Sequence, residues 1–143
     1  MTDDTTTPTR RVIEEAYNAG RLETLDDVLA PEFVGTDPAL PEPIRGIEAE
    51  KQIVAAYRSG FPDLHITIDD MIVAGDKVVT RWTARGTHTG ELWGMAPTGK
   101  EVTVTGIGID RVANGRIVEA WNNWDTLGFM QQLGAVPVAA ATT

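Results

Sequence analysis

The chain has 143 residues, which is enough for one domain with a substantial core. It contains no cysteine, which excludes disulfides, thiol chemistry and cysteine-ligated zinc or iron–sulfur sites. A net charge of −9 disfavours nucleic acid and anionic membrane surfaces as partners, because phosphate binding needs a basic patch.

No apolar run reaches the length of a membrane span, and the N-terminus lacks the apolar core of a signal peptide. We therefore expect a cytoplasmic protein that does not bind a membrane. Residues 1–9 are polar and threonine-rich, and we expect them to form a disordered tail. Residues 137–143 are expected to be a flexible tail, which leaves residues 10–136 as a single domain.

Two helices are predicted near the N-terminus from capping residues and from apolar side chains at helical spacing. The first begins near residue 10, after a cap at Thr9 or Thr7, and ends at Gly20. The second is short, begins at the cap Thr24 and is stopped by Pro31. The side chains expected to turn inward are Val12, Ile13, Ala16, Tyr17, Leu25, Val28 and Leu29.

Residues 32–45 contain three prolines, so they are predicted to form a loop or an irregular edge rather than a central strand. A third helix opens at Gly46 and continues to about Arg58, with Tyr57 on its apolar side. A further one or two turns of helix are predicted over residues 127–134.

Four antiparallel strands are predicted in the second half of the chain. Residues 64–73 alternate as a half-buried strand does, and the others span about 77–88, 101–112 and 116–124. Asn114-Gly115 between two alternating runs is a strong hairpin signal. Helices followed by strands predict an α+β fold, with helices on one face of a curved sheet.

Alternation along the last three strands selects one face that could line a pocket. Gly106 and Gly108 on that face would leave room, and Trp82 and Trp124 would wall a cavity suited to a flat, largely apolar ligand. The glycines are equally compatible with sheet curvature, and the tryptophans with an ordinary core. The residues of this face are Val78, Thr80, Trp82, Ala84, Gly86, His88, Val102, Val104, Gly106, Gly108, Asp110, Val118, Ala120, Asn122 and Trp124.

Four stretches of the chain carry a family resemblance: Gly-Thr-His-Thr-Gly-Glu (86–91), Gly-Met-Ala-Pro-Thr-Gly-Lys (94–100), Asn-Gly-Arg-Ile-Val-Glu (114–119) and Trp-Asp-Thr-Leu-Gly-Phe-Met-Gln-Gln-Leu-Gly (124–134). Together they resemble the SnoaL-like polyketide cyclases of the nuclear transport factor 2-like superfamily, over about residues 10–136. The resemblance implies a cone-shaped α+β barrel with a deep pocket. It also implies a homodimer or higher homo-oligomer, and chemistry without metal or organic cofactor.

The resemblance also implies a mechanism from which this chain departs. Characterised anthracycline members are ester cyclases that close a ring by intramolecular aldol condensation, with an aspartate on the last strand as acid/base. That position falls on Asn122 here, and the polar neighbours of the family fall near Gly106 and Gly108. Because an amide does not titrate near neutral pH, Asn122 can orient a carbonyl but cannot take an α-proton.

Three residues are candidates for catalysis. His88 lies on the predicted pocket face, and histidine titrates near neutral pH, although a loop-holding hydrogen bond explains it equally well. Asp70 shares its parity with Ile66, Ile68 and Ile72, so it is expected to point inward; a solvent-facing strand end would explain it, and Asp110, as well. Asp125 lies near the expected mouth, where an N-cap role for the final helix is favoured.

The predicted substrate contacts are Asn122, Tyr17, Trp82, Trp93, Trp124, Gly106 and Gly108, with Trp93 as a lid in the loop over the mouth. No metal site is predicted, because His65 and His88 lack acidic ligands at a fixed spacing. The resulting hypothesis is a cofactor-independent enzyme that moves a proton next to a carbonyl of a hydrophobic, oxygenated, polyketide-like molecule, giving cyclisation, isomerisation or hydration. The alternatives are a polyketide-tailoring hydroxylase and a small-molecule-binding protein without catalysis.

Overall fold

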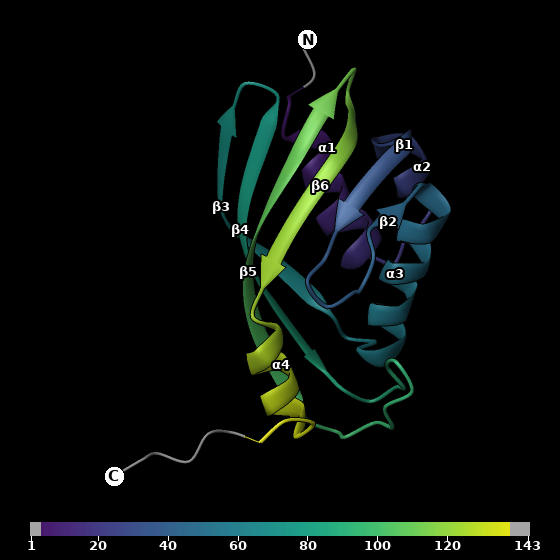
Figure 1. The fold of residues 1–143 in the computed structure, drawn as a ribbon, viewed down its shortest axis with the longest axis vertical. Coiled ribbons are helices and arrows are strands. Elements are labelled where there is room, and N and C mark those ends of the chain that lie inside the picture. The colour runs from purple at the N-terminus through teal and green to yellow at the C-terminus, as the bar shows by residue number, and fades with distance from the viewer. Residues whose placement is uncertain (1–3, 138–143) are drawn as a thin grey trace.

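The computed structural model describes residues 4–137 and has an α+β fold (Figure 1). In chain order its elements are α1 (Thr7–Arg11), the π-helical turn η1 (Val12–Tyr17), α2 (Thr24–Val28), β1 (Leu29–Thr36), β2 (Ile44–Arg45), α3 (Ile47–Gly60), β3 (His65–Ala74), β4 (Lys77–Thr87), β5 (Glu101–Ala113), β6 (Arg116–Trp124) and α4 (Thr126–Leu133).

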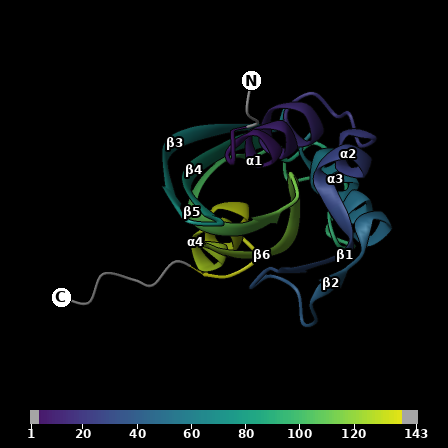
Figure 2. The same cartoon turned by 90° about the horizontal axis from the view of Figure 1, so that it is seen from above.

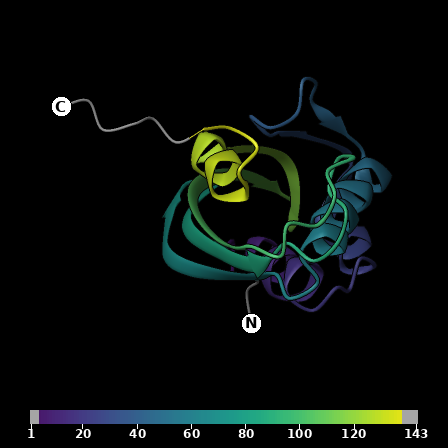
Figure 3. The ribbon, with the colours of Figure 1, turned by 90° about the horizontal axis from the view of Figure 1, so that it is seen from below.

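The strands form one curved, unclosed sheet of six strands in the order β2-β1-β6-β5-β4-β3. Seen from above, β3 to β6 curl around one side of the molecule while α1, α2 and α3 lie on the opposite side (Figure 2). Seen from below, α4 lies across one end of the curled sheet (Figure 3). Among residues 4–137, no helix combines the length and the apolar character that crossing a membrane requires.

The predicted antiparallel arrangement is confirmed for β3 to β6, but the structure adds a parallel strand that the sequence analysis missed. Residues Leu29–Thr36 form β1, which lies between β2 and β6 and pairs in parallel with β6. The prediction of a loop or irregular edge over residues 32–45 was therefore wrong for residues 32–36, whereas the two residues of β2 do form an edge of the sheet. The three prolines that motivated it fall between β1 and β2, in residues 37–43, where no ladder hydrogen bond is needed.

Thr9 and Thr24, which were predicted as helix caps, make hydrogen bonds to other elements and do not cap a helix. α1 begins at Thr7 with Thr6 at the N-cap position, and the hydroxyl of Thr9 donates to Asp110 Oδ2 on β5 over 2.7 Å. Thr24 lies inside the first turn of α2 and donates to Glu15 Oε1 over 3.0 Å. The predicted caps therefore lie within three residues of the observed N-cap positions, Thr6 and Glu23. The hydroxyls of Thr9 and Thr24 bind side chains of other elements and not the backbone of their own helix.

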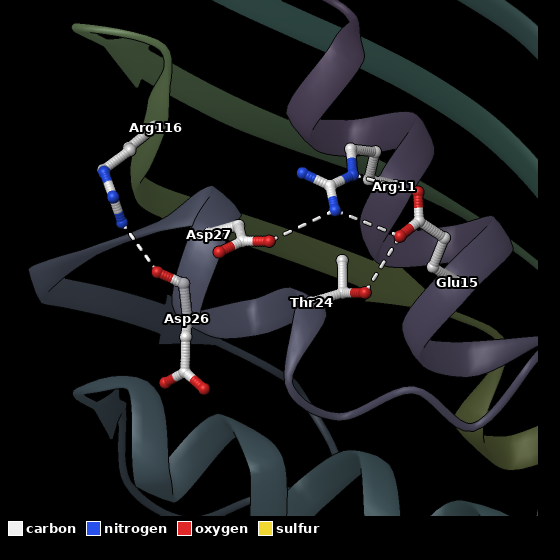
Figure 4. A network of polar contacts seen from close by, with 6 residues as sticks. All are labelled: Arg11, Glu15, Thr24, Asp26, Asp27 and Arg116. Atoms are coloured by element: carbon white, nitrogen blue, oxygen red, sulfur yellow. Dashed lines mark hydrogen bonds and ion pairs between the residues drawn. The ribbon is translucent and has the colours of Figure 1, made fainter.

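A polar network holds the N-terminal helices to each other and to β6 (Figure 4). Arg11 pairs with Glu15 at 2.9 Å and with Asp27 at 3.3 Å, which ties α1 to η1 and α2. Arg116 of β6 donates to the backbone oxygen of Asp26 over 2.8 Å. Exposed ion pairs of this kind stabilise little individually, so their main effect is to fix the orientation of α2.

Buried apolar side chains form two separate clusters at opposite ends of the inner face. One gathers beneath α2 and α3, and consists of Ala16, Leu25, Val28, Leu29, Phe33, Val54 and Ile117. The other gathers near α4, and consists of Phe61, Ala84, Leu92, Val102, Val104, Phe129 and Leu133. A cavity lined by members of both clusters lies between them.

A register shift in β6 changes which of its residues face the cavity. Ile117 pairs with Val112 and Glu119 with Arg111, so Val118 is an extra residue of a β-bulge. Ile117 is consequently buried and lines the cavity, whereas Val118, predicted on that face by strict alternation, does not.

Asp125 is the N-cap of α4, and its carboxylate accepts a hydrogen bond from Gly128 N over 2.9 Å. It is exposed and does not line the cavity, so the structure supports the capping alternative rather than the candidate catalytic position.

Replacing Asp125 by alanine is expected to lower the free energy of unfolding by about 1 kcal/mol, because the Gly128 N–H loses its acceptor. Urea denaturation of both proteins measures this. Asp125→Asn is the matched control, since asparagine caps a helix as well as aspartate does. A loss of the same size in both variants would contradict the capping role.

Candidate active site

The cavity has a volume of about 170 Å³ and lies between the helices and the inner face of β4, β5 and β6. This slightly exceeds an engineered cavity of about 150 Å³ that binds benzene, so at least one ring fits inside. Its walls are mainly aromatic and aliphatic, and the polar side chains among them are Thr9, Tyr17, Asp37, Glu50, Tyr57, Thr80, Trp82, Asp110, Asn122 and Trp124, with exposed Arg85 at its border.

Trp82 and Trp124 both line the cavity, and each indole N–H is used inside it. Trp82 Nε1 donates to Asn122 Oδ1 over 3.2 Å, and Trp124 Nε1 donates to Asp37 Oδ1 over 3.0 Å. Because an indole can only donate, the first contact fixes the amide of Asn122 with its oxygen towards Trp82. The Nδ2 group of Asn122 has no partner in the described part of the chain and remains available to a ligand.

The two strand glycines have different roles. A Cβ at Gly106 would lie 2.7 Å from Cβ of Trp124 and closer still to the Trp82 ring, so the tryptophans fill this space. Gly106 is therefore not a lining residue, contrary to its predicted role as a substrate contact. Gly108 does line the cavity, but a Cβ there would lie 2.8 Å from Oδ1 of Asn122, so the missing side chain makes room for the Asn122 amide.

A polar corner surrounds Gly108. The pairing of the strands places Thr80 of β4 and Asn122 of β6 on either side of it, in one row across the sheet. The hydroxyl of Thr80 is buried, with 3% of the residue exposed, and has no hydrogen-bond partner within residues 4–137. Buried polar groups are nearly always paired, so a ligand atom or water beside the Thr80 hydroxyl would complete this corner.

Asp110 supplies a carboxyl to the same corner, two residues after Gly108 on β5. Burial raises its pKa to about 6, and the hydrogen bond from Thr9 only partly opposes this effect. Most Asp110 carboxyls are thus ionised at neutral pH, yet protonation is readily reached. The sequence analysis placed Asp110 on this face but did not select it.

Glu50 brings a second carboxyl from the helical wall. Its position on α3 belongs to the inward stripe that includes Ile47 and Val54, and its side chain lines the cavity. Burial, followed by the nearby charges of Asp110 and Asp37, raises the pKa of Glu50 to about 7. A glutamate at an apolar position of a helical stripe was a readable sequence signal, and it was missed.

Asp37 and two tyrosines complete the polar lining. Tyr57 Oη donates to Asp37 Oδ2 over 3.2 Å, and the backbone N–H of Ala39 donates to Oδ1 over 2.8 Å. Burial, followed by the charge of Asp37, raises the pKa of Tyr57. Burial, followed by the charge of Glu50, raises the pKa of Tyr17 well above its ordinary value. Both phenols therefore stay protonated at neutral pH; the hydroxyl of Tyr17 can donate to a ligand, whereas that of Tyr57 already donates to Asp37.

Asp70 does not face the cavity, so its expected inward orientation was wrong. Ile68 pairs with Trp82 and Asp70 pairs with Arg81, which makes Asp69 the extra residue of a bulge in β3. One extra residue reverses the parity of everything after it. Asp70 is consequently exposed on the outer face and accepts a hydrogen bond from Met71 N.

His88 is fully buried, but it does not line the cavity. Its ring stacks on Phe61 with 5.3 Å between ring centroids, and Nδ1 accepts a hydrogen bond from Thr98 N over 3.2 Å. Its backbone N–H donates to the oxygen of Lys100 over 2.9 Å. These contacts clamp the base of the β4–β5 loop, which agrees with the loop-holding alternative. Nε2 has no partner in the described residues.

Trp93 lies outside the cavity, at the tip of the β4–β5 loop, and is 45% exposed. Its ring packs edge-on against Tyr57 and Phe129, at 5.5 and 6.3 Å between centroids. Both of those rings line the cavity, so Trp93 covers part of its wall from outside. The lid role stays a prediction.

The described residues contain no group of three or more His, Asp or Glu side chains arranged to hold a metal ion. What the cavity offers instead is two carboxyls with raised pKa values, two phenols and a corner of unsatisfied hydrogen-bonding groups. Such groups in an apolar surrounding suit proton transfer and the recognition of ligand oxygens.

A curled sheet with helices across its open side and a cavity between them defines a protein with the nuclear transport factor 2-like fold. The chain belongs to the SnoaL-like polyketide cyclase family, whose sequence model matches residues 7–133.

Relatives of known structure and curated function agree with this assignment. IdmH of Streptomyces antibioticus, described as a proposed polyketide cyclase, is 35% identical, with a TM-score of 0.78 over 92% of this chain and 99% of that one. The aklanonic acid methyl ester cyclase AcmA of Streptomyces galilaeus is 29% identical over 127 residues, which cover 87% of each chain. A SnoaL-like protein from Jannaschia sp. CCS1 shares the fold, with a TM-score of 0.84 and 24% identity over 96% of this chain and 100% of that one.

Proposed function

We propose that this protein is a cofactor-independent enzyme that moves a proton next to a carbonyl of a hydrophobic, oxygenated, polyketide-like molecule, leading to ring closure or isomerisation. The observation that supports this most is Asp110, an ionisable carboxyl inside an apolar cavity that also contains the unpartnered hydroxyl of Thr80. The relatives named as polyketide cyclases support the same substrate class.

The polar corner suggests how the reaction would proceed. A ligand carbonyl lying against Thr80 and Asn122 would accept hydrogen bonds from the hydroxyl of Thr80 and from Nδ2 of Asn122. Asp110, next along the inner face of β5, would take the α-proton while those donors stabilise the enolate oxygen. A base whose pKa is about 6 is well matched to this task at neutral pH.

This assignment replaces the three predicted catalytic residues. His88 holds a loop, Asp70 lies on the outer face, and Asp125 caps α4. It also accounts for Asn122 at the position of the family's aspartate. The carboxyl is supplied from the neighbouring strand, since Asn122 pairs with Gly108 and Asp110 follows two residues later. Asn122, Tyr17, Trp82, Trp124 and Gly108 remain the proposed ligand contacts.

The rival functions lack an observation that favours them. AclR of Streptomyces galilaeus, described as a proposed hydroxylase, has 22% identity and a TM-score of 0.82, which speaks for the fold alone. A binding protein without catalysis gains nothing from Asp110, a carboxyl whose raised pKa means that it is only partly compensated by Thr9 and costs free energy on folding.

Proton exchange of a model ketone tests the proposal. We expect the protein to exchange the α-hydrogens of β-tetralone for deuterium in heavy water faster than buffer does, at a rate that rises with pH and levels off above about pH 6. Proton NMR follows the loss of the α-signals. Exchange no faster than in buffer, although the ketone binds, would favour the binding-protein alternative.

A further inference from the structure

We propose that Glu50 is a second catalytic residue, a general acid that protonates the newly formed alkoxide when this protein closes a ring. This inference rests on the proposed function, because it assumes that Asp110 forms an enolate in the same cavity. It adds that the two proton transfers of an aldol reaction use different carboxyls: Asp110 on the sheet wall of the cavity and Glu50 on the helical wall.

The two carboxyls lie over the two ends of one row of paired residues in the sheet. Gly35 of β1 pairs with Ala120 of β6, and Ala120 pairs with Asp110 of β5. Neighbouring strands lie about 4.8 Å apart, so roughly 10 Å separates Gly35 from Asp110 along the sheet. Oε2 of Glu50 lies above Gly35, 3.7 Å from where a Cβ would be. The ring of Phe33 also lies over Gly35, 3.1 Å from that Cβ position, and Ala120 lies between Gly35 and Asp110 in this row.

The small side chain of Ala120 in this row leaves space for the reacting part of a ligand. Ala120 lines the cavity and has only a methyl group there. A ligand lying over Ala120 would have Asp110 at one end and Glu50 at the other. Its enolate half would be near the polar corner and its acceptor carbonyl near α3.

A purely structural role does not explain Glu50. Within the described residues its carboxyl has no hydrogen-bond donor and no cation as partner, although its helix position faces the core. The ionisable groups that face it are acidic or phenolic: Asp37 after β1, Asp110 on β5, Tyr17 on η1 and Tyr57 on α3. A lone carboxyl among them is costly to ionise, and thus is kept as a proton donor.

The two carboxyls titrate in the order that the reaction needs. The pKa of Asp110 is about 6 and that of Glu50 about 7, so between these two pH values Asp110 is mostly ionised while most Glu50 carboxyls still hold a proton. The negative charge on Asp110 itself helps to keep that proton on Glu50. In this pH range Asp110 can therefore act as a base while Glu50 acts as an acid.

The step balances without any co-reactant. Asp110 takes an α-proton, and the resulting enolate carbon attacks the acceptor carbonyl carbon. A carbon–carbon bond forms, the carbonyl π bond breaks, and its electron pair becomes an alkoxide that takes the proton of Glu50. Water then carries the proton from Asp110 back to Glu50, so the net reaction is an isomerisation to a β-hydroxy ketone.

A triketone that can close on itself tests this assignment. The probe is a cyclopentanedione that bears a methyl group and an oxobutyl side chain on the carbon between its carbonyls. We expect the wild-type protein to close it to a bicyclic ketol, and Glu50→Gln to slow ring closure by about 10²–10⁴-fold. The same variant should exchange the α-hydrogens of β-tetralone at the wild-type rate, because exchange needs only Asp110. Glu48→Gln, on the exposed face of α3, is the matched control.

The pH dependence of the wild-type protein gives an independent readout that needs no variant. Ring closure should follow a bell-shaped profile that falls above about pH 7, while β-tetralone exchange should not fall there. Glu50→Gln should remove the high-pH limb from the residual ring closure.

The outcomes separate the two proposals. Absence of exchange in the wild type contradicts the proposed function itself. Exchange that depends on Asp110, together with ring closure that is absent in the wild type or unchanged in Glu50→Gln, contradicts only the role of Glu50. A flat high-pH limb for ring closure contradicts it as well.

Discussion

Replacing Asp110 by asparagine is expected to slow the α-proton exchange of β-tetralone by about 10²–10⁴-fold, since the amide cannot accept the proton. Asparagine has nearly the same shape, and its Oδ1 can still accept the hydrogen bond that Thr9 donates over 2.7 Å. The loss should therefore be chemical rather than structural. Ketone binding, measured by quenching of tryptophan fluorescence from Trp82 and Trp124, should change little.

Asp70→Asn is the matched control for this prediction. It makes the same change to an aspartate of the same sheet, but one that lies on the outer face after the β3 bulge. Exchange should stay at the wild-type rate. If Asp70→Asn slowed exchange as much as Asp110→Asn did, or if neither variant slowed it, the assignment of Asp110 as the base would be wrong.

Much of the fold was predictable because its signals are local. The Asn114-Gly115 hairpin has positive φ at both residues, as a type I′ turn requires, and the strands on either side pair antiparallel as predicted. β1 was not predictable in this way. Its partner β6 lies more than 80 positions away in the chain, and no turn signal announces a parallel pairing.

The site was harder to predict, because each β-bulge reverses the face on which the following residues of the strand lie, and the sequence does not reveal the bulge. One extra residue at Asp69 turned Asp70 outward, and one at Val118 brought Ile117 inward. Where the strand was regular, as in β5, parity placed Asp110 correctly. Glu50 was missed for a different reason. Apolar residues at helical spacing predict the helix, and a carboxyl at one of those positions does not add to that pattern, although it indicates an ionisable group that faces the core.

The same two carboxyls should make the stability of the protein fall as the pH rises. A carboxyl whose pKa is higher in the folded state than in the unfolded state binds more protons when folded, so stability is lost as the pH rises. For Asp110 this occurs between its ordinary value of 3.8 and about 6, and for Glu50 between 4.5 and about 7. Each difference in pKa corresponds to roughly 3 kcal/mol at most above the upper pH.

Asp110→Asn and Glu50→Gln should therefore each gain stability relative to the wild type as the pH rises from 4 to 8. Urea denaturation across this range measures the gain, which should level off above about pH 6 for the first variant and about pH 7 for the second. Glu48→Gln, whose side chain is 82% exposed, should show no such gain. A wild-type protein whose stability relative to the variants does not change with pH would mean that neither carboxyl is held in an unfavourable state. The variants that lose chemistry should thus be the ones that gain stability, which is expected of groups retained for reaction rather than for folding.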